Sequence, residues 1–376
     1  MIALSEISIP AVCPALGPPA LTDGAIAVLN LGAQIDGLEG HGTSAEAATL
    51  IDLLILRGLT LGRISDYERA AQLADRLVHD AAADAAAYMA RARTRAVFHR
   101  FSEALDDLDH ADRISPQDTP AKQERAAILQ ALGRYDEALA TYEDVADRGG
   151  QFEQAGALAG LWADRGETDT AQRLYLEGLR TYRGVSPFPL ALLDFQLGTM
   201  WMRHGRLDEA RACFEAAIRR VPAFAAAQGH LAEVEADLGE PEAAITLLYP
   251  LAAASDDPDY AAQLARILGE MGRNDEARGW CRLAAERYDE LTAVHPAAFA
   301  DHAAEFWLGV GNDPPKGLRF AEFNLRVRKT PRAYDLVAQA LDAKTAGAAS
   351  ARCLGVQLTR RAANQLDGEC NGRESD

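Results

Sequence analysis

The fold of this 376-residue chain is decided by the stretch Leu197-Gly198-Thr199-Met200-Trp201, which continues through Gly205-Arg206-Leu207-Asp208-Glu209-Ala210 to Phe214, Ala217 and Pro222. Gly205 marks a tight turn, because glycine relieves the steric penalty at the C-terminus of a helix. The acidic pair that follows is typical of a helix start, where negative charge complements the positive end of the helix dipole. The small residues Gly198 and Ala210 allow two helices to approach closely. The stretch therefore predicts a pair of packed antiparallel helices.

The same pattern recurs along the chain. Its second small residue is an alanine at seven positions, which lie 34, 34, 33, 39, 34 and 33 residues apart: Ala70, Ala104, Ala138, Ala171, Ala210, Ala244 and Ala277. Another small residue precedes each of these alanines by twelve positions: Gly58, Ala92, Ala126, Ala159, Gly198, Ala232 and Ala265. A fixed period of this length is the signature of stacked helical repeats. It predicts seven units: 51–84, 85–118, 119–151, 152–185, 191–224, 225–257 and 258–291.

The best copy resembles the tetratricopeptide repeat (TPR) family. Its Leu-Gly, aromatic, Ala, Phe, Ala and Pro positions follow the family pattern in order, from Leu197 to Pro222. The resemblance implies an all-α fold, a right-handed TPR-type superhelical solenoid of stacked antiparallel helix pairs. It also implies that the first helix of each pair lines a concave groove. Such motifs specify a fold far better than a function.

The chain on either side of the seven repeats divides by composition. Thr22 is placed to cap a helix that covers the exposed end of the first repeat, since the ends of a solenoid need capping. Ser65 and His99 stand where a turn glycine is expected in the first two units. The expected organisation is as follows: 1–21 an irregular lead, 22–45 a capping helix, 51–291 seven repeats, 292–360 degenerate repeats, and 361–376 a polar flexible tail.

Composition limits the class of protein. The net charge of −18 argues against broad electrostatic binding to nucleic acid or to an anionic membrane. The five cysteines form no CxxC pair, which favours a reducing compartment. The start of the chain is a poor secretory signal, and no apolar run approaches the length of a membrane-spanning helix. We expect a soluble, cytoplasmic protein.

Catalytic motifs are scarce. The sequence holds no P-loop, no HExxH and no context for a nucleophile elbow, so we expect no enzyme activity and no cofactor. The abundant acidic pairs are typical of helix starts and solvated faces.

One pattern admits a second interpretation. His230 and Glu233 occupy the same two repeat positions as His302 and Glu305. Residues three apart share a helix face, and imidazole with carboxylate binds divalent metals. The intervening repeat places Arg266 at that position, where it would repel a cation. The favoured interpretation is therefore that these side chains are ordinary polar residues of a groove, and a metal site is the alternative.

The family's inward positions, carried over unit by unit, give a candidate partner-binding groove. Its residues are Arg93, Gln130, Phe195, Thr199, Met202, Arg203, His230, Glu233, Arg266, His302 and Glu305. The Lys/Asn pattern by which some TPR domains hold a C-terminal carboxylate is missing. Acidic inward candidates outnumber arginines, which favours a basic or mixed-charge peptide. The leading hypothesis is a non-catalytic protein- or peptide-binding scaffold. The alternative is a small-molecule or metal-responsive receptor that uses the central groove around His230 and His302.

Overall fold

The computed structural model describes residues 21–39, 43–81, 83–116, 119–146 and 151–345, without the side chains of 145–146 and 151–154. Every regular element in these ranges is an α-helix. The expected lead before residue 21, the last residues of the degenerate repeats (346–360) and the expected tail (361–376) lie outside the described residues.

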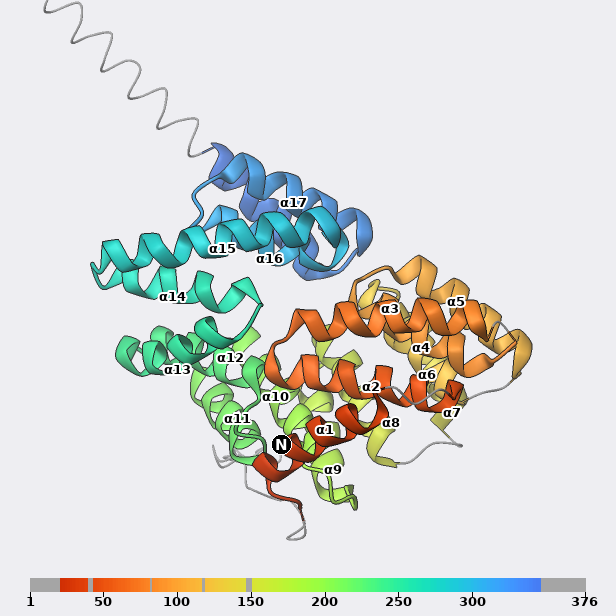
Figure 1. Ribbon diagram of the computed structural model, residues 1–376. Helices are drawn as coiled ribbons and strands as arrows, with labels where there is room; N and C mark the ends of the chain where they lie inside the picture. The colour runs from red at the N-terminus through yellow and green to blue at the C-terminus, as the bar shows by residue number, and fades with distance from the viewer. Residues whose placement is uncertain (1–20, 40–42, 82, 117–118, 147–150, 346–376) are drawn as a thin grey trace, which may run out of the picture. The chain divides into compact units, whose positions relative to one another are not determined.

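The helices follow one another as antiparallel pairs joined by tight turns, and the seven pairs from α2 to α15 are stacked (Figure 1). The pairs are α2 Ser44–Leu61 with α3 Ile64–Asp80, α4 Ala85–Val97 with α5 Phe101–Ile114, α6 Thr119–Ala131 with α7 Tyr135–Ala146, α8 Gln151–Asp164 with α9 Thr168–Thr181, α10 Phe188–Arg203 with α11 Leu207–Arg220, α12 Ala225–Asp237 with α13 Pro241–Ala254, α14 Pro258–Glu270 with α15 Asn274–Val294, and α16 Pro296–Leu308 with α17 Pro314–Val327. The predicted all-α superhelical solenoid is confirmed.

The chain divides into two compact units, Met1–Ala298 and Phe299–Asp376. In the second unit, a helix over 331–345 follows α17, and its Leu336 and Ala340 pack against Ala304, Leu318 and Ala321.

The turns follow the predicted chemistry with one correction. Glycine adopts the left-handed conformation at the turns of the third to seventh repeats, for example Gly205 at φ +69°. His99 takes the glycine position in the second repeat with φ +53°. In the first repeat the prediction for Ser65 is wrong. There α2 already ends at Gly62, which carries φ +62°, and Ser65 belongs to the first turn of α3.

Helix α1 (Gly24–Leu38) packs Leu31 and Ile35 into the core of the first repeat. The prediction that Thr22 caps it is wrong. The cap is Asp23, whose side chain accepts hydrogen bonds from the backbone of Ala25 and Ile26. The backbone N–H of Thr22 instead donates to the carbonyl of Val185, at 2.9 Å, in the junction between the fourth and fifth repeats. The start of the described chain is thus tied to the middle of the array.

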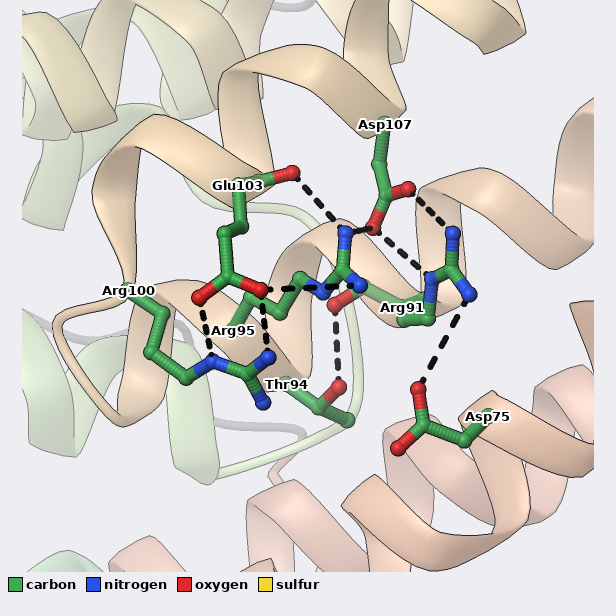
Figure 2. Close-up of polar contacts among 7 residues, drawn as sticks. All are labelled: Asp75, Arg91, Thr94, Arg95, Arg100, Glu103 and Asp107. Atoms are coloured by element: carbon green, nitrogen blue, oxygen red, sulfur yellow. Dashed lines mark hydrogen bonds and ion pairs between the residues drawn. The ribbon is translucent and has the colours of Figure 1, made fainter.

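Buried ion pairs join the helices within and between repeats. Asp107, on α5, is 1% exposed and accepts hydrogen bonds from Arg91 at 3.0 and 2.6 Å and from Arg95 at 2.6 Å, both on α4 (Figure 2). Arg100 and Glu103 form a more exposed pair beside them. The same device, a buried carboxylate held by arginine, recurs in other repeats: Arg57–Asp66, Arg220–Asp194, Arg211–Glu235 and Arg328–Asp301. A buried carboxylate needs such a partner, because removing a charge from water is costly.

The first repeat also contacts repeats that lie far along the chain. Helix α2 contacts α12 of the sixth repeat, and one end of the orange α2 lies towards the green α12 (Figure 1). The carboxylate of Asp256, in the connection between α13 and α14, accepts from the backbone N–H groups of Ile64 (2.5 Å) and Ser65 (2.9 Å). Since α3 has no side-chain cap of its own, Asp256 provides one from 191 residues beyond Ser65. Ser255 adds a hydrogen bond to the carbonyl of Gly62.

Histidines extend this contact. His295 stacks on Phe98, with ring centroids 3.9 Å apart, and its Nε2 lies 3.3 Å from a carboxylate oxygen of Glu68. His99 Nδ1 donates to the carbonyl of Ala297 at 3.0 Å. Burial lowers the pKa of His295 and outweighs the opposing effect of Glu68. We call this contact the seam, formed by Gly62, Ile64, Ser65, Glu68, Phe98 and His99 on one side and by Ser255, Asp256, His295 and Ala297 on the other.

Candidate functional site

Polar side chains link the first helices of consecutive repeats. Arg93 on α4 donates to Asp52 on α2 at 2.8 Å and lies 3.7 Å from Glu124 on α6. Burial raises the pKa of Glu124, and Arg93 opposes that rise. One arginine thus connects three repeats and partly neutralises two carboxylates.

A second chain of contacts runs from the third to the fifth repeat. The amide of Gln130 on α6 donates to Asp164 on α8 at 2.7 Å. Arg203 on α10 donates to the other oxygen of the same carboxylate at 3.3 Å. Both predicted residues, Gln130 and Arg203, therefore meet at Asp164.

The sixth and seventh repeats carry a third group. His230 Nδ1 lies 3.3 Å from Glu233 one turn further along α12. Arg266 on α14 pairs with Glu270 at 3.1 Å. Burial raises the pKa of Asp237, and Arg266 again opposes the rise.

These contacts define what we call the first-helix face: Asp52, Arg93, Glu124, Gln130, Asp164, Arg203, His230, Glu233, Asp237, Arg266 and Glu270. It holds six carboxylates and three guanidiniums, and each of the three arginines already pairs with a carboxylate. The face therefore carries excess negative charge.

The apolar residues of the candidate groove are occupied by the chain itself. The Phe195 ring centroid lies 5.8, 5.2 and 5.5 Å from the rings of Phe214, Phe224 and His230. Leu59 of α2 packs against the same cluster. Thr199 donates its hydroxyl to the carbonyl of Phe195 at 3.0 Å, and Met202 packs against the neighbouring core. The expected anchor for a partner is thus largely filled by side chains of the first, fifth and sixth repeats.

His302 and Glu305 belong to the second unit. Glu305 pairs with Arg332 at 2.8 Å, and His302 is half-buried. Among the residues that the structure describes, no cluster of three or more His, Cys, Asp or Glu side chains could hold a metal ion. The metal alternative therefore gains no support from these side chains. Cys281 is also a poor nucleophile, because burial raises the pKa of its thiol.

Sequence reasoning missed the seam and the buried ion pairs. Asp256 and Asp257 stand together before Pro258 and read as one helix cap. In the structure Asp257 caps α14, by accepting from the N–H of Asp259 at 3.0 Å, and Asp256 is left for the distant helix α3. A duplicated acid before a capped helix is the one signal that pointed to this contact.

Comparison with known proteins agrees with this geometry. A family model described as tetratricopeptide repeat matches residues 55–119 and 197–261. Together with the stacked pairs, this match supports a tetratricopeptide repeat protein. A search of curated protein sequences found no match.

Two similar solved structures are of human IFIT1. The dimer with PPP-AAAA is 16% identical, with 76% of this chain and 73% of that chain covered and a TM-score of 0.52. The dimer with m7Gppp-AAAA is 17% identical, with 81% and 72% covered and a TM-score of 0.53. At these identities the likeness concerns the fold alone.

None of the helices in the described ranges combines the length and the apolar character that a membrane-spanning helix needs.

Proposed function

We propose that the protein is a non-catalytic scaffold that binds a basic or mixed-charge segment of another protein along the first-helix face. The observation that carries the proposal is the excess of carboxylates on that face, six against three guanidiniums. Complementary charge favours association with a positively charged segment and disfavours a negatively charged one.

The similarity to IFIT1 with PPP-AAAA raises RNA as a different kind of partner. Phosphate groups are held by arginine and lysine, and a favourable RNA surface carries an excess of them. On the first-helix face the arginines at 93, 203 and 266 are each engaged by a carboxylate. A phosphate would have to displace those carboxylates and then face the remaining ones. Peptide is therefore the favoured partner class.

The test is a titration of the full chain with labelled peptide pools of matched length, one rich in lysine and arginine and one rich in aspartate and glutamate. We expect saturable binding of the basic pool and none of the acidic pool. An AAAA oligonucleotide with a 5′-triphosphate forms a third arm, and its binding in preference to the basic peptides would overturn the proposal.

Charge reversal locates the site. Asp52→Lys and Glu270→Lys change carboxylates of the first-helix face that are 48% and 60% exposed, so the fold should tolerate them. Asp136→Lys and Asp275→Lys are the matched controls, because these carboxylates are 92% and 93% exposed and lie on second helices. We expect several-fold weaker binding of the basic pool to the first pair only. Equal effects of the two pairs would place binding elsewhere.

A further inference from the structure

An apolar pocket lies where the first repeat meets the fifth. Its volume is about 260 Å³. One wall is formed by Leu56 and Leu59 of α2, and the opposite wall by Phe188 and Leu192 of α10. Val221 and Phe224, in the turn between α11 and α12, complete it. The pocket therefore exists only while α2 lies against the fifth repeat.

The lining is almost entirely carbon. Among the residues that the structure describes, the side-chain polar atoms that border the pocket are the hydroxyls of Thr60 and Ser186, and no charged side chain borders it. Thr60 is 3% exposed and already donates its hydroxyl to the carbonyl of Leu56 at 2.7 Å. A polar group that entered would lose its hydrogen bonds to water without replacement, whereas a hydrocarbon would gain from leaving water.

Size and chemistry together narrow the class of ligand. An apolar cavity of about 150 Å³ is enough to bind benzene. The present pocket is larger, about 260 Å³, and has room for a hydrocarbon chain of medium length. A protein segment fits poorly, because its backbone N–H and C=O groups need partners that these walls do not offer.

We propose that this pocket is a binding site for an uncharged aliphatic chain, and that an occupied pocket stabilises the docking of the first repeat on the rest of the array. The coupling follows from the position of the walls. A ligand that touches both α2 and α10 binds only the docked form, and it must therefore shift the equilibrium towards that form.

The test uses the full-length protein and two probes of equal length, 1-octanol and 1,8-octanediol. Calorimetry should show saturable binding of one octanol per chain and a rise in the thermal midpoint with octanol concentration. The diol must bury a second hydroxyl among carbon atoms, so we expect it to bind at least about tenfold more weakly. No octanol binding, or equal binding of the two probes, would overturn the proposal.

Two substitutions assign the binding to this pocket. Leu192→Trp should fill it and abolish octanol binding, and Leu59→Trp fills it from the opposite wall if the first variant does not fold. Leu176→Trp is the matched control, because Leu176 is also partly buried but does not line the pocket. Asp256→Asn weakens the seam and should lower octanol affinity several-fold. Octanol binding that survives in both folded pocket variants would refute the assignment.

Discussion

At Gly198 the missing side chain allows Phe214 to lie directly against the first helix of its repeat. A Cβ at this position would stand 2.7 Å from a carbon of the Phe214 ring, which is fully buried. Gly58 has the same relation to Tyr67, again at 2.7 Å. At these two positions the aromatic ring of the second helix therefore requires a glycine, although helix propensity disfavours one.

Gly198→Ala should destabilise the protein by about 1–3 kcal/mol, because the ring or the helix has to move. Gly279→Ala is the control. Gly279 also lies inside a helix, α15, but a Cβ there would meet nothing within 4 Å. That substitution should stabilise the protein by about 0.5–1 kcal/mol, through helix propensity and a less flexible unfolded chain. Urea unfolding measures both, and effects of the same sign would contradict this account.

The buried carboxylate of Asp107 gives a second prediction at this scale. Asp107→Asn removes the closest charge partner of Arg91 and Arg95, whose side chains are 19% and 15% exposed and whose other carboxylates, on Asp75 and Glu103, lie at 3.8 Å. We expect a loss of about 3 kcal/mol or more in the free energy of unfolding. Glu103→Gln removes a carboxylate that is 47% exposed and that pairs with Arg100 and, at 3.8 Å, with Arg95; it should cost at most about 1 kcal/mol. Similar losses for the two variants would mean that burial does not govern the strength of these pairs.

At the scale of helices and their contacts, local and distant features differ in how well sequence predicts them. The hairpins could be predicted because a turn glycine such as Gly205 and the paired small residues lie within one unit of the sequence. The seam could not, because it joins Ile64 to Asp256 through a single carboxylate, and no periodic signal links positions so far apart. Likewise, the inward position of Phe195 was predicted from the repeat, but the packing of Leu59 of the first repeat against the same core cluster was not.

The seam should respond to pH through His295. Burial holds the pKa of its imidazole below the ordinary value of 6.5, while Glu68 acts against this and Arg100 and Arg287 add to it. As the pH falls below about 6.5, the unfolded chain binds a proton at this histidine that the folded protein resists. Stability should therefore be retained above that pH and decline below it.

His295→Gln tests the assignment, since glutamine keeps a hydrogen-bonding group but does not titrate near neutral pH. Urea midpoints between about pH 5 and pH 8 should vary less in the variant than in the unaltered protein. An identical pH profile for the two proteins would show that His295 is not the responsible group.

For the molecule as a whole, charge is the dominant electrostatic property. The net charge of −18 opposes compaction through self-repulsion, and the same charge favours a basic guest. Raising NaCl to about 1 M shortens the Debye length to about 3 Å and screens both effects. We expect a higher thermal midpoint and several-fold weaker binding of the basic peptide pool. If about 1 M NaCl changes neither the thermal midpoint nor the affinity for the basic peptide pool, electrostatics explains neither the stability nor the binding.

The cap that Asp256 places on α3 also restricts how this array can change in length. An open solenoid tolerates the gain or loss of a unit, because each unit contacts only its neighbours. Here the hairpins between α3 and α14 set the distance and rotation at which Asp256 meets Ile64 and Ser65. Duplicating or deleting one of these hairpins would move Asp256 away from Ile64 and Ser65. The number of units between these points is therefore fixed by geometry, and divergence in this part of the protein has to proceed by substitution.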